Sequence, residues 1–305
     1  MLRFLVRRLI VALLVALTVM VLAFVLTRLS GDLAISIAGP SATQADVDAV
    51  RKAYGLDRPL VVQFFDWMGQ AMTGHLGESF FFKQPVAALI GERMSVTLTL
   101  GLTGLVIALL LSIPLGIVAA VNENTALDRV VQLIALLGQA MPSFWLALLL
   151  MITFGLQLGW LPISGTDSWE SYIMPGVVLA FSAVPALTRL TRAGMIQAMA
   201  ADYIRTARAK GLSRASILLK HALRNAAIPV VAVAAVQLGF MLGGSIVIEQ
   251  VFALHGVGFL AWESIQKNDF PVVQSVVLVL AVIYVALTML ADTLNAVLDP
   301  RLRGA

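Results

Sequence analysis

"SVTLTLGLTGLVIALLLSIPLGIVAAV", from Ser95 to Val121, contains no charged residue. A helix needs roughly 20 apolar residues to cross a hydrocarbon core about 30 Å thick, so this stretch is long enough to span a membrane. Similar uncharged runs recur along the chain. Together the expected spans are Leu9 to Thr27, Ser95 to Val121, Val130 to Leu158, Tyr172 to Thr188, Ala226 to Ile248, and Val272 to Ala291. The sequence therefore predicts an all-α integral membrane protein with six transmembrane helices.

The composition also indicates a lipid environment. Charged residues make up 12% of the 305 residues, against about 25% in a typical soluble domain, and the mean hydropathy is +0.93. The isoelectric point near 9.7 could suggest nucleic acid, but the basic residues are sorted by membrane side. With a cytoplasmic N-terminus, most of them fall in the inner segments, and the two short outer loops hold only Lys267. This pattern obeys the positive-inside rule. We therefore expect both termini in the cytoplasm and no nucleic-acid partner.

The first apolar run resembles a secretory signal, because Arg3, Arg7 and Arg8 precede it. The run is longer than the roughly 7–15 residues of a signal h-region. We interpret residues 1–27 as a cytoplasmic N-terminus and a retained first transmembrane helix. The chain has no cysteine, which excludes disulfides and thiol catalysis.

Residues 28–94 are more polar than the rest and predict a small helical subdomain outside the membrane. Ser41 or Thr43 can cap a helix that Gly55 ends, and an amphipathic helix with Phe64, Phe65, Trp67 and Met68 on its apolar part follows. This second helix could lie on the membrane surface or cover a gate. We assign residues 95–298 to the transmembrane domain and 299–305 to a cytoplasmic tail.

Residue patterns typical of enzymes are missing. His75, His221 and His255 fall in different segments, and neither HExxH, GxSxG nor a Gly-Lys pair occurs. We expect no catalytic residue and no metal site. The expected spans also hold no ionisable residue of the kind that secondary transporters use for ion coupling. Glu249 and Asp292 follow the ends of spans, and we expect them to meet water or a basic neighbour.

Polar residues inside the spans are few. "GQAMPSFW" places Gln139, Pro142 and Ser143 within the third run and predicts a kink there. Such a break is tolerated where neighbouring helices or a cavity satisfy the freed backbone groups. Gln139, Ser143 and Gln237 are our candidates for lining a pathway, although ordinary helix packing explains the kink equally well.

The inner segment Arg189 to Asn225 is the most basic part of the chain. Its sequence favours a helix from about Gly194 to Lys210, and Gly211 can supply the left-handed conformation that closes it. Ser213 can cap a second helix from Arg214 towards Asn225. Anionic lipid or docking to a cytoplasmic partner could explain the charge. The embedded glycine and cap favour a shaped element, and hence a partner.

The inner segment "DYIRTARAKGLSRASILLKHALRNAAIPVV" (Asp202 to Val231) resembles the cytoplasmic loop of the permeases of bacterial ABC transporters of the dipeptide/oligopeptide family. The resemblance covers most of the chain. The other matching stretches are "YGLDRPLVVQF" (Tyr54 to Phe64), "HLGES" (His75 to Ser79), "PSFWLALLL" (Pro142 to Leu150), "LGWLPISG" (Leu158 to Gly165), "LTRAGM" (Leu190 to Met195), "GGSIVIEQVF" (Gly243 to Phe252), "GVGFL" (Gly256 to Leu260), "DFPVVQ" (Asp269 to Gln274) and "LDPRLR" (Leu298 to Arg303). "DSWESYIMP" (Asp167 to Pro175) and "FMLGGSIVIEQVF" (Phe240 to Phe252) are similar to the permeases of glutathione importers.

The resemblance implies a type I ABC importer permease fold in the bacterial inner membrane. It implies a non-catalytic subunit that forms half of a translocation pathway for di- or oligopeptides or a related solute such as glutathione. Its implied partners are a second homologous permease subunit in a heterodimer, two ATP-binding subunits that hold ATP and magnesium, an extracytoplasmic substrate-binding protein and the lipid bilayer. This chain itself would bind no cofactor. The alternative is a self-contained secondary transporter or channel.

The resemblance also implies where the ATPase subunits attach. The family loop begins Glu-Ala-Ala and ends Leu-Pro, whereas this chain has Arg205, Thr206 and Ala207 and ends Leu223-Arg224. Ala207 and Gly211 carry over by position. The ATPase-coupling residues that the resemblance implies are Arg205, Thr206, Ala207, Lys210, Gly211, Leu212 and Ser213.

Overall fold

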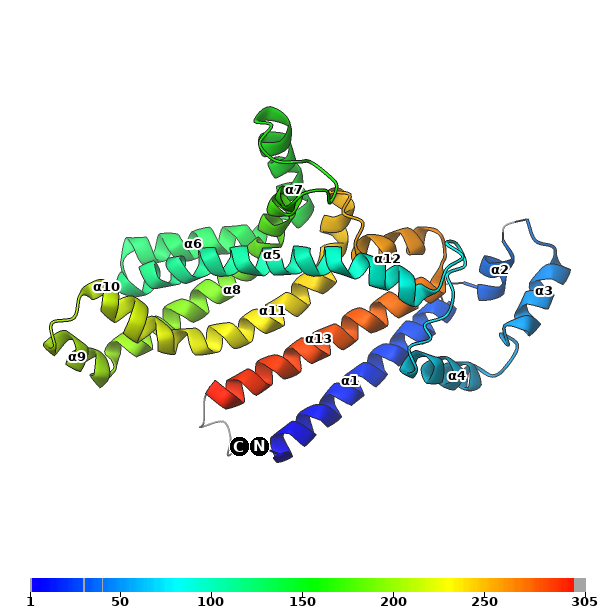
Figure 1. The fold of residues 1–305 in the computed structure, drawn as a ribbon, viewed down its shortest axis with the longest axis horizontal. Helices are drawn as coiled ribbons and strands as arrows, with labels where there is room; N and C mark the ends of the chain where they lie inside the picture. Colours follow the sequence, from blue (N-terminus) through cyan, green and yellow to red (C-terminus); the bar gives the residue numbers. More distant parts are fainter. Residues whose placement is uncertain (1, 30, 40, 299–305) are drawn as a thin grey trace.

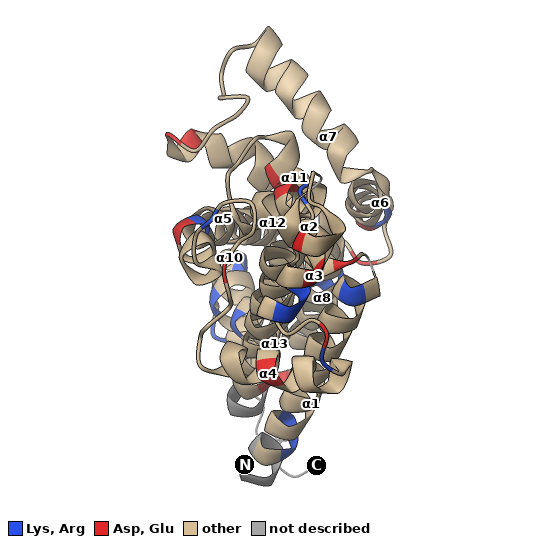
Figure 2. Cartoon of the chain, turned by 90° about the vertical axis from the view of Figure 1, so that its right-hand side faces the viewer, with Lys and Arg blue, Asp and Glu red and all other residues tan. Residues whose placement is uncertain are grey.

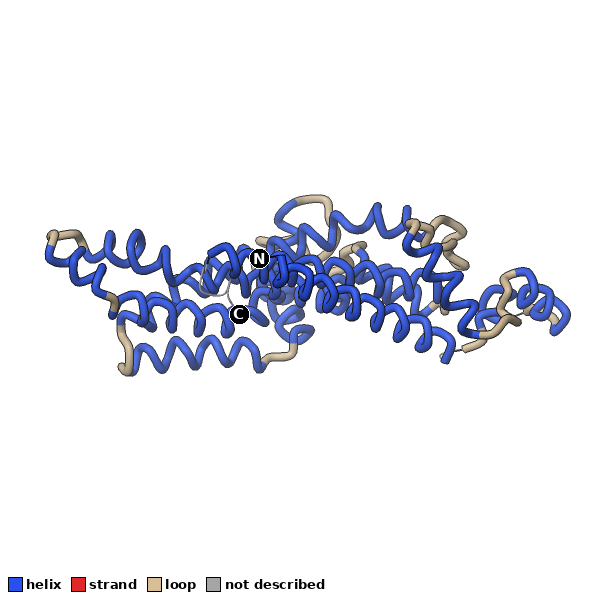
Figure 3. Tube along the Cα trace, turned by 90° about the horizontal axis from the view of Figure 1, so that it is seen from below, coloured by secondary structure: helices blue, strands red, loops and turns tan. Residues whose placement is uncertain are grey.

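A computed structural model describes residues 2–29, 31–39 and 41–298; the expected tail 299–305 lies outside them. The described chain is almost entirely helical (Figure 3), and its only strand-like pairing is an isolated bridge between Glu78 and Pro85. The helices of the bundle run roughly along the long axis of the molecule (Figure 1). Short helices cover the two ends: α2 to α4 with α12 at one, and α9 with α10 at the other.

Five helices are long and apolar enough to cross a membrane, and a bent pair forms a sixth span if it is counted as one. The spans are α1 (Leu2–Leu29), α5 (Val86–Val121), α8 (Ile173–Ala200), α11 (Leu223–Val251) and α13 (Phe270–Leu298), with the pair α6 (Ala126–Ala140) and α7 (Ser143–Leu150). Acidic and basic residues occupy little of the ribbon (Figure 2). The expectation of six spans is therefore met, with the third span broken.

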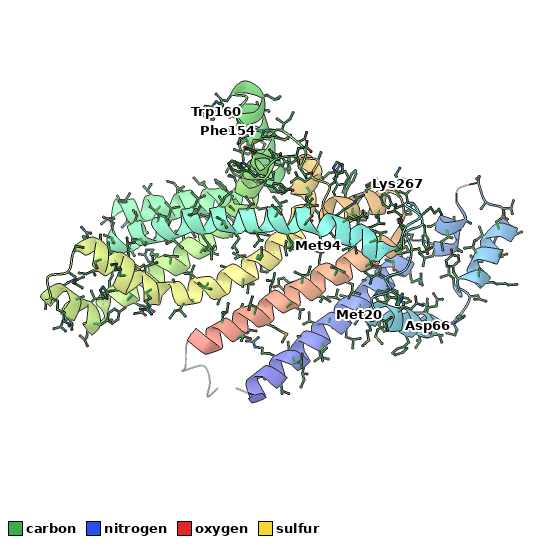
Figure 4. All side chains as sticks on the ribbon, in the orientation of Figure 1. Met20, Asp66, Met94, Phe154, Trp160 and Lys267 are labelled. Atoms are coloured by element: carbon green, nitrogen blue, oxygen red, sulfur yellow. The ribbon has the colours of Figure 1, made fainter. Side chains whose placement is uncertain are left out.

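The break in the third span lies at the predicted kink. Met141 is extended, with φ −77° and ψ 131°, because a residue that precedes proline is disfavoured in the helical region. The chain bends by 98° between α6 and the helical segment that follows Pro142, which α7 begins and a π-helical stretch (Met151–Gln157) continues. This segment projects from the bundle (Figure 1), with Phe154 and Trp160 together near its far end (Figure 4). By contrast, Pro114 and Pro185 lie inside continuous helices.

Small residues bring the central helices together. α5 and α8 share the most extensive contact between any two elements described. A Cβ on Gly116 of α5 would lie 2.5 Å from Thr191 Cβ of α8, and one on Gly176 of α8 would lie 2.8 Å from Thr103 Cγ2 of α5. Any larger side chain would push the helices apart. Membrane helices pack through such small residues because lipid supplies no hydrophobic driving force between them.

The segment between α1 and α5 contains the two predicted helices. Thr43, not Ser41, caps α3 (Gln44–Ala53) in a capping box with Asp46, and Gly55 follows the helix with φ +63°. The amphipathic helix α4 (Leu60–Met72) rests Phe64 and Trp67 on Phe24 of α1, with ring centroids 5.4 and 6.2 Å away. The short helix α2 (Leu33–Ala38) was not predicted. Another short helix, α12 (Val257–Gln266), connects α11 to α13 and was also not expected.

Candidate functional site

The inner segment folds into a short helix and a tight turn at one end of the bundle (Figure 1). The predicted single helix from Gly194 to Lys210 is wrong, because Ala201 adopts an extended conformation (φ −75°, ψ 151°) that separates α8 from α9 (Asp202–Ala209). The predicted second helix is not separate either. α10 (Arg214–Ser216) continues through a π-helical stretch (Ile217–Ala222) directly into α11. The fifth span therefore begins in this segment.

Gly211 makes the predicted turn. Its φ is +73°, a left-handed conformation in which L side chains are strained. Gly211 N donates to Arg208 O at 3.0 Å and Leu212 N donates to Ala207 O at 3.3 Å, which together form a Schellman helix end. Ser213 Oγ then accepts from Ser216 N at 3.3 Å and caps α10. Both conformational predictions for this turn are confirmed.

The inner face of this turn is anchored in an apolar cluster. Ile204 and Ala207 of α9 and Ile217 and Ala222 of the following stretch are buried against residues at the adjacent ends of α5, α8 and α11. Tyr203 Oη accepts from Asn225 Nδ2 at 2.9 Å. The apolar cluster and this hydrogen bond therefore both hold the turn. It is a defined structural element that packs against three spans.

The seven residues of the predicted coupling set divide by exposure. Ala207 is buried, 6% exposed, so it supports the turn and its side chain has little surface for a partner. The others are exposed: Arg205, Thr206, Lys210, Gly211, Leu212 and Ser213. The pair between Arg205 and Asp202 at 3.2 Å is largely exposed and contributes little to stability. The exposed surface of the turn thus presents two cations, Arg205 and Lys210, and the apolar side chain of Leu212.

The structure does not bring the candidate pathway residues Gln139, Ser143 and Gln237 into one cluster. Gln139 and Ser143 lie on opposite sides of the break in the third span and are exposed. Gln237 is partly buried on α11. Within the described residues, none of the three side chains makes a hydrogen bond or lines a described pocket. Their role as pathway lining stays a prediction.

A buried ion pair supports the helices behind the turn. Arg192 of α8 donates from Nε and Nη2 to the two carboxylate oxygens of Asp128 at 2.8 and 2.7 Å, and the Asp128 side chain is 3% exposed. Asn124 N and Gln132 Nε2 donate to the same carboxylate at 3.0 and 2.8 Å. The pair fixes the start of α6 to α8. The sequence analysis missed it because residues 64 positions apart give no local signal of contact.

Glu249 does not meet water or a basic neighbour, so that expectation was wrong. It is fully buried. Its Oε1 accepts from Thr97 Oγ1 and Ser245 Oγ, each at 2.8 Å, and its Oε2 accepts from Phe259 N at 2.8 Å. Phe259 lies in the first turn of α12, where orphan amides and the helix dipole favour a carboxylate. Glu249 therefore joins α5 and α11 to the start of α12.

The other flanking carboxylate behaves as expected. Asp292 of α13 pairs with Arg8 of α1 at 2.9 Å, so the start of α1 and the end of α13 lie on the same side of the bundle.

At the opposite end of the bundle, Asp269 is fully buried. It accepts from the Ser79 hydroxyl and from the amides of Phe80 and Phe81 at 3.1 and 3.2 Å. This carboxylate fastens the loop before α5 to the loop before α13.

The described residues contain no group of three or more His, Asp or Glu side chains placed to hold a metal ion. His75 and His255 are exposed. His75 Nδ1 lies 3.0 Å from Thr73 Oγ1, and His255 stacks edgewise on Phe259. These two histidines thus have local, peripheral contacts.

Comparison with protein families matches residues 112–304 to the binding-protein-dependent transport system inner membrane component, and residues 1–101 to the N-terminal membrane component of such systems. The chain belongs to this permease family. It is 40% identical over 304 residues to the glutathione transport system permease protein GsiC of Escherichia coli strain CFT073 and to that of strain K12, and the match covers 99% of each chain.

Among solved structures, the permease is similar to a chain of the MetNI methionine ABC transporter in an inward-facing conformation. The TM-score is 0.55 at 18% identity, over 69% of this permease and 96% of that chain. This likeness supports the fold. The expected ABC importer permease fold and family are confirmed. The protein is a multi-pass inner-membrane permease subunit of an ABC importer, and its family implies ATPase and substrate-binding partners.

Proposed function

We propose that this permease forms half of a translocation pathway for a peptide-like solute, with glutathione or a short peptide as the substrate class. The observation that carries this proposal is the 40% identity to a glutathione transport system permease over 99% of both chains. The described spans present no metal cluster, and their buried carboxylates are engaged by hydroxyls, amides or Arg192. The permease delegates recognition to a substrate-binding protein outside the membrane.

In this proposal the turn from Arg205 to Ser213 is the docking element for an ATPase subunit. Arg205 and Lys210 present positive charge, and Leu212, 39% exposed, presents an apolar contact. Ala207 and Ile204 anchor the same turn to the inner ends of the spans. A push on the turn therefore moves α8 and α11 together, which is the mechanical requirement of coupling.

The remaining assignments follow if the turn docks an ATPase subunit in the cytoplasm. The turn faces the cytoplasm, and both termini lie on the same side. The pair between Arg8 and Asp292 supports this assignment, because it holds the start of α1 beside the end of α13. Residues 28–94 form the outer subdomain, 95–298 the permease domain, and 299–305 the tail. The partners are a second, homologous permease, two ATPase subunits that hold ATP and magnesium, and a substrate-binding protein. This chain catalyses no reaction and binds no cofactor.

Uptake by the reconstituted complex tests the proposal. The permease is purified with its partner subunits, placed in liposomes containing ATP, and given the substrate-binding protein with labelled glutathione, a tripeptide or a free amino acid. We expect ATP-dependent uptake of glutathione or the tripeptide and none without the binding protein. Uptake by the permease alone down a proton gradient would favour a self-contained secondary transporter. Uptake of the free amino acid alone would overturn the substrate class.

A further inference from the structure

A small basic hollow lies between α6 and α8, apart from the turn. It has a volume of about 290 Å³ and is lined by Arg129, Gln132, Leu133 and Leu136 of α6 and by Arg189 of α8. Arg129, Leu133 and Leu136 share one face of α6, because residues three and four apart lie one above the other on a helix. The hollow thus has a cationic end and an apolar wall.

The two arginines are available to a ligand. Both are exposed, and neither forms an ion pair within the part of the chain that the structure describes. The adjacent carboxylate, Asp128, already accepts hydrogen bonds from Nε and Nη2 of Arg192 at 2.8 and 2.7 Å. Gln132 is held on Asp128 as well, at 2.8 Å, so one wall of the hollow is fixed. Two uncompensated guanidinium groups therefore converge on one space.

The hollow lies at the edge of the hydrocarbon region. Arg129 immediately precedes the uncharged run that starts at Val130, and Arg189 immediately follows the run that ends at Thr188. Leu133 and Leu136 lie within the run and are 59% and 54% exposed. A ligand that touches both the arginines and these leucines must carry an anion at the membrane boundary and an apolar chain below it. A water-soluble subunit cannot follow the leucines into lipid.

We propose that this hollow binds the headgroup of an anionic phospholipid, with one acyl chain along Leu133 and Leu136. The planar forks of Arg129 and Arg189 match the oxygens of a phosphodiester. Basic pockets between membrane helices on the cytoplasmic side are suited to anionic headgroups. The hollow adjoins the Asp128–Arg192 pair, so a bound lipid contacts both α6 and α8 on their lipid-facing surface.

Native mass spectrometry of the purified transporter complex tests binding. After delipidation, the complex is titrated with phosphatidylglycerol or with zwitterionic phosphatidylethanolamine. We expect one phosphatidylglycerol to be retained with roughly ten-fold or greater preference, and the preference to be lost in Arg129→Gln/Arg189→Gln. The matched control is Arg214→Gln/Arg224→Gln, which removes two exposed cations elsewhere on this side and should keep the preference.

A second measurement localises the lipid without disturbing the arginines. Because the chain has no cysteine, Leu136→Cys can be labelled with a fluorophore and quenched by brominated phosphatidylglycerol. Leu110→Cys, at a leucine of α5 that is 67% exposed, is the control. Selective quenching at position 136 is expected. Equal quenching by brominated phosphatidylcholine, displacement by millimolar inorganic phosphate, or a hollow occupied by another subunit and free of lipid would each overturn the proposal.

Discussion

Replacing Gly211 by valine should uncouple the permease from its ATPase without removing it from the membrane. The left-handed φ of +73° costs a β-branched residue about 1–3 kcal/mol. No atom lies within 4 Å of the site where the new Cβ would stand, so the perturbation is conformational and not a clash. The strain distorts the turn that presents Lys210 and Leu212. If the whole strain opposes docking, coupling falls by about 5- to 150-fold.

The assay compares binding-protein-stimulated ATP hydrolysis and substrate uptake in liposomes, with the amount of inserted permease measured in parallel. Gly211→Ala should give a smaller defect, because its penalty is about 1–2 kcal/mol. The matched control is Gly74→Val. Gly74 also has a positive φ, +84°, and open space around it, but it follows α4 at the opposite end of the molecule. Normal uptake by Gly211→Val, or an equal loss in Gly74→Val, would refute the coupling assignment.

Three further changes test the buried carboxylates. Asp128→Ala should lower the free energy of unfolding by about 2–4 kcal/mol, because it leaves the guanidinium of Arg192 unpaired in a partly buried place. The double variant Asp128→Leu/Arg192→Met should recover most of this loss. Equal melting temperatures of the single and the double variant would contradict the expectation. Glu249→Gln should lower the free energy of unfolding by about 1–3 kcal/mol, because the amide NH2 would face hydroxyl and amide groups that are themselves donors. An unchanged melting temperature would argue against the hydrogen bonds described. Asp269→Ala should free the loop at Ser79, so limited proteolysis should cut there faster than in the parent, while identical cleavage patterns would count against the anchor.

The carboxylates of Asp269 and Glu249 show why such contacts escape sequence analysis. Asp269 and Ser79 are 190 residues apart, and neither belongs to a local pattern that predicts a partner. Glu249 gave a misleading signal, because its place after an uncharged run suggested a helix end in water. The helix continues to Val251, and α5 and α12 close over the carboxylate. Burial of this kind depends on elements that meet only after folding.

Local patterns did determine the parts of the site that are themselves local. Gly211 and Ser213 predicted a left-handed turn and a helix cap, and the structure has both, because each depends on backbone groups a few residues away. Pro142 likewise predicted the kink in the third span. The sequence could not set the size of that bend, since the 98° angle depends on how α7 packs against neighbours and not on the proline alone.

The sequence by itself determined the membrane location, the number of spans and the family. Hydrophobic length and charge asymmetry act on each segment separately and need no knowledge of the fold. Only the tertiary structure decided which polar groups are paired. It joined Arg192 to Asp128, enclosed Glu249, and left Arg129 and Arg189 facing a shared hollow. Those outcomes depend on the crossing of α5, α6, α8 and α11, and close approach between helices is set by side chains that lie far apart in the chain.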